Sequence, residues 1–117
     1  MLVDHGSRLP EANAGLDEFA DALRKRVPER IVGVAHLEIA KPDIAEGIAN
    51  CAEKGAEEIV VQPYFLSPGR HTTKDIPGQV ARAARKYPGI RIQISEPMGG
   101  HAALLDVVLD RVNDADR

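Results

Sequence analysis

Apolar residues follow two alternating patterns along the 117-residue chain. Short apolar runs, typical of buried strands, occur at residues 1–5, 31–38 and 59–61, and residues 90–94 alternate between apolar and polar, which suits a half-exposed edge strand. Each run is followed by a segment in which apolar residues recur at helical spacing, and these segments lie at residues 11–27, 42–54, 77–86 and 102–112. Because four short strands alternate with four amphipathic helices, the pattern predicts an α/β fold.

Strands that alternate with helices pair in parallel, so we expect a doubly wound, four-stranded parallel sheet with helices on both faces. A strand order of 2-1-3-4 would place the first and third strands side by side. The connections leave these two strands in opposite directions, and ligands bind at the carboxyl edge of such a switch point. The length of 117 residues suits one domain, which we expect to cover residues 1–117.

Composition narrows the possible partners. Apolar residues make up 44% of the chain and charged residues 28%, as in soluble globular proteins. The net charge of -3, with cations spread along the chain, gives no basic footprint for nucleic acid. No apolar run is long enough to span a bilayer and no signal peptide is visible, so we expect a cytoplasmic protein without membrane contact.

The chain has one cysteine, Cys51. A single thiol excludes an internal disulfide and an all-cysteine zinc or iron–sulfur site within one chain. Cys51 falls on the apolar side of the helix predicted over residues 42–54, so we expect it to be a small core residue.

The connection after the third predicted strand, residues 62–77, is the longest in the chain. It places Arg70 beside His71 and is stiffened by Pro63, Pro68 and Pro77. Long connections inside compact domains are usually functional or disordered, and the prolines argue against disorder. The alternative is a surface connection with an incidental histidine, and this stretch alone leaves both interpretations open.

All four histidines lie at or near the carboxyl edge of the predicted sheet: His5, His36, His71 and His101. Glu38 ends the second predicted strand, on the same side as His36. Imidazole and carboxylate groups bind first-row divalent metals and exchange protons near neutral pH. Purely structural roles stay open for two of these histidines. His36 would pack in the core, and His101 would cap the last helix. No local metal-binding spacing is present, so a site would be assembled from separate loops.

Anion contacts are expected from the first strand-to-helix turn and from two arginines. Ser7 and Arg8 precede a predicted helix, whose N-terminus presents free N–H groups to anions, although an ordinary turn fits equally well. Arg8 and Arg70 match carboxylates in a two-pronged geometry. Exposed arginines are common, so neither of them decides the matter alone.

Four motifs together resemble the sirohydrochlorin chelatases, the short single-domain branch of the class II chelatases. In chain order they are Asp4-His5-Gly6-Ser7-Arg8, Ala35-His36-Leu37-Glu38 with Pro42, Pro63 to His71 with Asp75-Ile76-Pro77, and Pro97-Met98-Gly99-Gly100-His101. The resemblance runs in order over nearly the whole chain, and the pairing of Gly-Arg-His with His-Gly-Ser-Arg is specific.

The resemblance implies a doubly wound half domain and a lyase that inserts Co²⁺ or Fe²⁺ into sirohydrochlorin, for cobalamin or sirohaem biosynthesis. The family's metal-handling histidines match His5 and His71, and its acidic site residue matches Glu38. Longer relatives contain two such domains around one cleft, so a homodimer is expected. Some relatives carry an iron–sulfur cluster near the C-terminus, which Cys51 alone cannot support here. The metal is then a substrate, and no tightly bound cofactor is expected.

The resemblance does not decide which site residue binds the metal and which takes the protons. His5 and His71 would hold the metal, take protons from the pyrrole nitrogens, or do both in succession. Glu38 would orient a histidine or take a proton. The carboxylates of the macrocycle would contact the set Ser7, Arg8, Arg70 and His101.

Three rival functions stay open. A carrier of metal or tetrapyrrole, working without turnover, would use the same residues. A half domain that needs a different partner chain would be inactive alone. Phosphoryl transfer through His5 is disfavoured, because a carboxylate, Asp4, precedes this histidine where such enzymes need an arginine.

Overall fold

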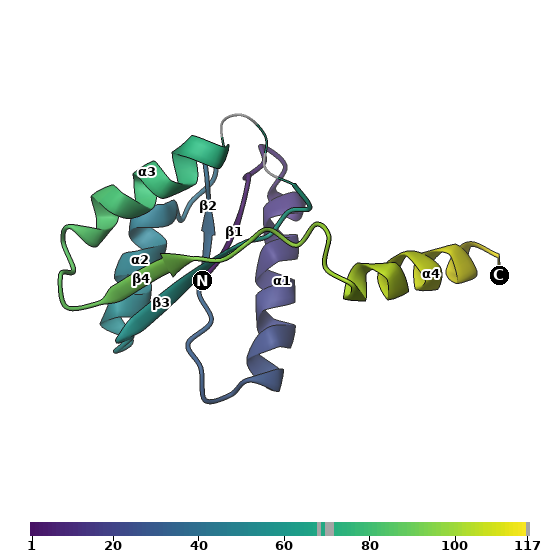
Figure 1. The fold of residues 1–117 in the computed structure, drawn as a ribbon, viewed down its shortest axis with the longest axis horizontal. Helices are drawn as coiled ribbons and strands as arrows, with labels where there is room; N and C mark the ends of the chain where they lie inside the picture. Colours follow the sequence, from purple (N-terminus) through teal and green to yellow (C-terminus); the bar gives the residue numbers. More distant parts are fainter. Residues whose placement is uncertain (68, 70–71, 117) are drawn as a thin grey trace.

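The computed structural model of the chain describes residues 1–67, 69 and 72–116. Its strands are β1 (Leu2–Asp4), β2 (Val34–His36), β3 (Glu58–Pro63) and β4 (Arg91–Ile94), and its helices are α1 (Pro10–Arg26), α2 (Ile44–Glu53), α3 (Thr72–Ala84) and α4 (Ala103–Ala115). The strands pair in parallel in the order β2-β1-β3-β4 (Figure 1). The predicted fold class, pairing and strand order are confirmed.

The sheet separates two layers of helix packing. On one face, α1 places Leu16 and Ala20 against Leu2 of β1 and Val32. On the other face, α2 and α3 cover the larger part of the core, which includes Val3, Ala35, Ile44, Ile48, Cys51, Ile59, Val61, Ile76 and Val80. Successive strand residues point to opposite faces, which explains why neighbouring Leu2 and Val3 belong to different clusters. The buried thiol of Cys51 confirms its expected place in the core.

Helix α2 begins at a capping box. The Asp43 Oδ1 atom accepts a hydrogen bond from the Glu46 N–H at 2.9 Å, and the Glu46 Oε1 atom accepts one from the Asp43 N–H at 3.2 Å. The Glu46 backbone N–H is also the main reason why the pKa of Asp43 lies below its ordinary value. The cap fixes the start of the helix, so that Ile44 and Ile48 fall on its buried side.

Several element boundaries differ from the sequence prediction, and β2 begins at Val34 rather than Ile31. Strand β2 ends at His36 rather than Glu38, because the chain turns sharply at Ile39. Helix α3 begins at Thr72, well before Pro77, which lies inside the helix instead of opening it. Proline is tolerated there at the loss of one intrahelical hydrogen bond. The last helix continues to Ala115.

Helix α4 differs from the other helices in its position. Figure 1 shows it projecting away from the sheet at the end of the chain. None of its residues is buried. A helix long and apolar enough to cross a bilayer does not occur within the described parts of the chain.

Candidate functional site

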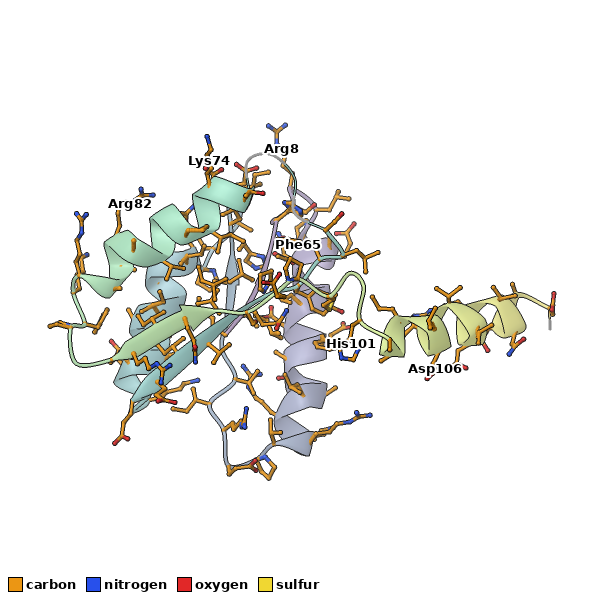
Figure 2. All side chains as sticks on the ribbon, viewed as in Figure 1. Arg8, Phe65, Lys74, Arg82, His101 and Asp106 are labelled. Atoms are coloured by element: carbon orange, nitrogen blue, oxygen red, sulfur yellow. The ribbon has the colours of Figure 1, made fainter. Side chains whose placement is uncertain are left out.

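His5 lies at the predicted switch point of the sheet. It directly follows β1, which pairs side by side with β3 through the register Val3 to Pro63. The imidazole is exposed and stacks on the ring of Phe65, with centroids 4.7 Å apart and planes at 30°. Phe65 itself packs against the main core cluster and is labelled in Figure 2. The His5 imidazole is thus held against an aromatic ring that packs on the core, while remaining exposed to a ligand.

Glu38 is brought to the same edge as His5 by the backbone. The Glu38 N–H donates a hydrogen bond to the His5 carbonyl at 3.1 Å, and the Leu37 N–H donates to the Asp4 carbonyl at 2.8 Å. From α3, the Gln79 side-chain amide donates to the Leu37 carbonyl at 3.2 Å. The Glu38 side chain is exposed. The structure therefore joins the segments that carry the two predicted site residues.

A strained turn follows Glu38. Ile39 has a φ of 74°, and the Ala40 N–H donates to the Glu38 carbonyl at 2.8 Å. A two-residue hydrogen bond around a positive φ describes a γ-turn of the rare, strained kind. A β-branched residue in this region costs on the order of 1–3 kcal/mol and persists only where its surroundings impose it. The turn fixes where strand pairing stops and therefore where the Glu38 carboxylate leaves the sheet.

Asp4 connects the ends of β1 and β2. Its Oδ1 atom accepts a hydrogen bond from the Gly6 N–H at 3.0 Å and lies 2.5 Å from Nδ1 of His36. His36 is only 2% exposed. This places His36 in the core, as the packing interpretation expected, and not among groups that reach a ligand. Asp4 thus ties the turn that carries His5 to the neighbouring strand.

We expect the substitution Asp4→Asn to lower the free energy of unfolding by about 1–2 kcal/mol, because hydrogen bonds to a charged acceptor are stronger than those to a neutral amide. Urea denaturation measures this change. The matched control is Asp17→Asn on α1, where the carboxylate is exposed, and there we expect a change within about 0.5 kcal/mol. Equal effects at both positions would show that Asp4 is an ordinary surface carboxylate.

The turn after His5 is closed by its own side chains. The Ser7 N–H donates to Asn13 Oδ1 at 2.9 Å, and Asn13 Nδ2 donates to the Ser7 carbonyl at 2.7 Å. The Leu9 N–H donates to Ser7 Oγ at 3.0 Å. The N–H groups of Ser7 and Leu9 therefore already have acceptors within the turn. This favours the interpretation as an ordinary turn over that of a preformed phosphate-binding site. Phosphoryl transfer through His5 is therefore further disfavoured, because it would need an anion-binding site at this turn.

Two basic side chains stand at this edge. Arg8 is exposed beyond the turn, and Lys74 is exposed in the first turn of α3. Figure 2 shows both side chains rising from the same end of the molecule. Lys74 was not among the predicted site residues, although it lies within the 62–77 connection, four residues after Arg70 in the sequence.

His101 lies where the connection after β4 meets α4 (Figure 2). Its Nδ1 atom accepts a hydrogen bond from the Ala103 N–H at 3.0 Å, so the capping interpretation is supported. The connection itself is fixed to the segment after β3, because the Met98 and Gly99 N–H groups donate to the carbonyls of Phe65 and Leu66 at 3.1 and 2.7 Å.

Two predicted site residues, Arg70 and His71, lie outside the described residues. The proposed metal pair of His5 and His71 therefore stays a prediction. Within residues 1–67, 69 and 72–116, no three or more His, Cys, Asp or Glu side chains form a group that could hold a metal ion.

Phe65 and Asp4 carry parts of the site that the sequence interpretation missed. In the sequence, Phe65 appeared only within the motif Pro63 to His71, and Asp4 only as the carboxylate that precedes His5. Alternation along β1 places Asp4 on the face opposite to Val3, and the parallel register pairs it with His36. That register was the one signal from which the Asp4–His36 contact could have been predicted.

Comparisons with known proteins agree with this geometry. A model of the CbiX family matches residues 1–115. The chain is 45% identical to the chloroplastic sirohydrochlorin ferrochelatase of Arabidopsis thaliana, over 96% of the chain and 50% of that protein. It is 31% identical to the sirohydrochlorin cobaltochelatase of Methanococcus maripaludis, over 97% of the chain and 96% of that protein.

A solved structure shares the fold. The sirohydrochlorin chelatase SirB from Bacillus subtilis subspecies spizizenii, in complex with cobalt, matches with a TM-score of 0.87 and 34% identity. The match covers 97% of this chain and 48% of the SirB chain. The chain thus spans about half the length of the Arabidopsis and Bacillus proteins and nearly all of the Methanococcus protein.

Proposed function

Because the chain belongs to the CbiX family, we propose that it is a chelatase that inserts Co²⁺ or Fe²⁺ into sirohydrochlorin. The observation that carries this proposal is the position of His5. An exposed imidazole stands at the switch point of the sheet, stacked on Phe65 and joined through the backbone to the segment of Glu38. Nitrogen and carboxylate groups at one edge are the donors that both metals accept.

The reaction exchanges one dication for two protons, so charge and atoms balance. The metal leaves its weak ligands for the four ring nitrogens, and the two inner N–H protons pass to bases on the protein or to water. We assign His5 as a ligand that surrenders the metal or as one of these bases, together with His71. A neutral imidazole suits both tasks. Glu38 would take a proton or orient the metal-bearing histidine.

Basic groups at the edge suit the carboxylates of the macrocycle. Arg8 and Arg70 are the proposed contacts, and the exposed amine of Lys74 adds a third. Their positive charges would locally offset the net charge of -3 of the chain, which by itself repels an acidic substrate. Ser7 would donate its hydroxyl proton, since its Oγ atom already accepts from the Leu9 N–H. His101 would use Nε2, because Nδ1 already accepts from the Ala103 N–H.

We also propose that the working unit is a homodimer. The Arabidopsis and Bacillus relatives are about twice the length that this chain covers, so a second copy would complete the opposite wall of the substrate cleft. A reducing compartment such as the cytoplasm suits Fe²⁺ and the free thiol of Cys51. No tightly bound cofactor is part of the proposal.

The test is an absorbance assay of sirohydrochlorin metallation without oxygen, with catalytic amounts of protein and either Co²⁺ or Fe²⁺. Many turnovers above the rate with heat-unfolded protein would support a chelatase, and the faster metal would indicate the physiological substrate. A spectral change limited to one macrocycle per protein would indicate a carrier instead. No change with folded protein would contradict both functions.

A further inference from the structure

Gln79 is a polar residue on the core-facing side of α3. Helical spacing places it beside Ile76, Val80 and Ala83. These three apolar side chains are buried in the main core cluster, whereas Gln79 is half-buried. A polar group is stable in such a position only where it finds a hydrogen-bond partner. The partner of Gln79 therefore shows why an amide occupies this position.

That partner is the backbone of the segment after β2. The Nε2 atom of Gln79 donates to the Leu37 carbonyl at 3.2 Å, across 42 positions of the sequence. Leu37 directly precedes Glu38, and its side chain is buried in the same core cluster as the apolar face of α3. Figure 1 shows α3 lying over the carboxyl end of β2. Gln79 thus connects α3 to the segment that carries the Glu38 carboxylate.

A single peptide group, between Leu37 and Glu38, is held from two sides. Its carbonyl accepts from Gln79 Nε2, and its N–H, which belongs to Glu38, donates to the His5 carbonyl at 3.1 Å. Because a peptide group is planar, hydrogen bonds at both of its ends restrict its rotation about the chain. The orientation of this plane also sets the direction in which the Glu38 side chain leaves the backbone.

The strained turn that follows makes this restraint more important. Ile39 has a φ of 74°, and a β-branched residue keeps such a conformation only where its surroundings impose it. Rotation of the peptide before Glu38 offers the chain a way to relieve the strain. Such a rotation would turn the carboxylate away from its present position. The Gln79 hydrogen bond opposes it directly.

The start of α3 is fixed as well. The Thr73 N–H and hydroxyl both donate to the Gly69 carbonyl, at 3.3 and 3.1 Å. His71 directly precedes α3 in the sequence. Gln79 therefore relates the helix that follows His71 to the segment that carries Glu38, just as the backbone relates Glu38 to His5.

We propose that Gln79 is a positioning residue for metal insertion, because its amide holds the Leu37–Glu38 peptide and thereby directs the Glu38 carboxylate toward the edge that carries His5. This role rests on the proposed function, in which Glu38 takes a proton or orients a histidine. Gln79 is assigned no contact with the metal or the macrocycle. Its loss should therefore lower kcat and leave KM nearly unchanged.

The first measurement does not depend on turnover. Gln79→Met keeps the length of the side chain and removes its N–H donor. Hydrogen exchange of the Glu38 amide, followed by NMR, should become faster by about 10-fold or more, because the peptide that contains it is released on one side. Gln93→Met on β4 is the matched control, since its side chain is exposed, and there exchange of the Glu38 amide should not change. Unchanged exchange in Gln79→Met would overturn the proposal.

The second measurement is the rate of metal insertion. We expect kcat to fall by about 10-fold in Gln79→Met, with KM within about 2-fold of the wild type. Gln79→Glu has nearly the same shape but places an acceptor against the Leu37 carbonyl, so its loss should be at least as large. Gln79→Glu also serves for every comparison if Gln79→Met does not fold. The control Gln93→Met should keep the kcat of the wild type.

A double-variant comparison separates positioning from a purely structural hydrogen bond. Single-turnover rates, with protein in excess over macrocycle, are measured for Gln79→Met in the wild-type and in the Glu38→Gln background. If Gln79 acts through the Glu38 carboxylate, the further decrease in the Glu38→Gln background should be less than about 2-fold. Equal fold decreases in both backgrounds would show general damage and overturn the proposal.

The two levels of inference fail in different ways. A wild-type protein that metallates sirohydrochlorin, with an unchanged kcat in Gln79→Met, would refute the positioning role and leave the chelatase intact. A wild-type protein without turnover would refute the chelatase and, with it, a positioning role in metal insertion. Faster exchange of the Glu38 amide in Gln79→Met would then still show that Gln79 restrains the Glu38 segment.

Discussion

The variant His5→Ala is expected to lower the rate of metal insertion by about 100-fold or more, because a positioned acid–base group contributes about 10²–10⁴-fold. The imidazole is exposed and contacts Phe65 through ring stacking. The free energy of unfolding should therefore change by no more than about 1 kcal/mol. The anaerobic absorbance assay measures the rate, and urea denaturation measures the stability.

Two further variants distinguish a specific role of His5 from a general disturbance of the carboxyl edge of the sheet. Phe65→Leu keeps the imidazole but removes the aromatic ring on which it stacks. We therefore expect a smaller decrease in the rate of metal insertion, of about 10-fold or less. His101→Ala removes an imidazole that the proposed function assigns to substrate binding, and should raise KM more than it lowers kcat. Equal losses of kcat in all three variants would mean that His5 has no special place in the chemistry.

The second large effect is expected from Gly6→Ala, next to the same histidine. Gly6 has a φ of 90°, and an added Cβ would lie 1.9 Å from the backbone carbonyl oxygen of Glu38. Backbone has to move to relieve this contact, so we expect the free energy of unfolding to fall by about 2–4 kcal/mol. Metal insertion should fall with it, because the displaced turn carries His5 away from Glu38.

Gly15→Ala is the matched control for this substitution. Gly15 lies inside α1, and no heavy atom lies within 4 Å of an added Cβ. Alanine is favoured over glycine in a helix by about 1 kcal/mol, so this variant should be slightly more stable and fully active. A Gly6→Ala protein as stable as Gly15→Ala would show that the turn after β1 adapts freely.

Much of the fold follows from the distribution of apolar residues. The short runs around Val3, Ala35, Ile59 and Ile92 alternate with helical segments, and the rules for parallel sheets then favour the strand order 2-1-3-4. The position of His5 at the switch point followed from that order. The buried Cys51 followed from the helical spacing of α2.

Other features depend on interactions that the pattern of apolar residues does not encode. Leu37 and Glu38 still donate hydrogen bonds to the carbonyls of Asp4 and His5, so the apolar run gave no sign that regular pairing ends at His36. The turn at Ile39 uses a β-branched residue where glycine or asparagine would have marked it. Pro77 suggested a helix start because proline is favoured in the first turn, but here the helix is already formed before it.

The parts of the site that remained hidden are contacts between distant segments. The Asp4–His36 pair joins residues 32 apart, and the His5–Phe65 stack joins two loops from opposite sides of the switch point. Neither is encoded by local spacing. Both follow from the register of three strands, which the sequence constrains only through the requirement to bury Val3, Ala35 and Val61 together.

The projecting α4 helix also bears on how the stability of this protein is to be described. In the proposed homodimer, contacts between the two copies, including any made by α4, would contribute to the folded state in proportion to mass action. Dilution would then remove the part of the folding free energy that those contacts supply. No single melting temperature belongs to such a protein, and each value has meaning only together with the concentration at which it was measured.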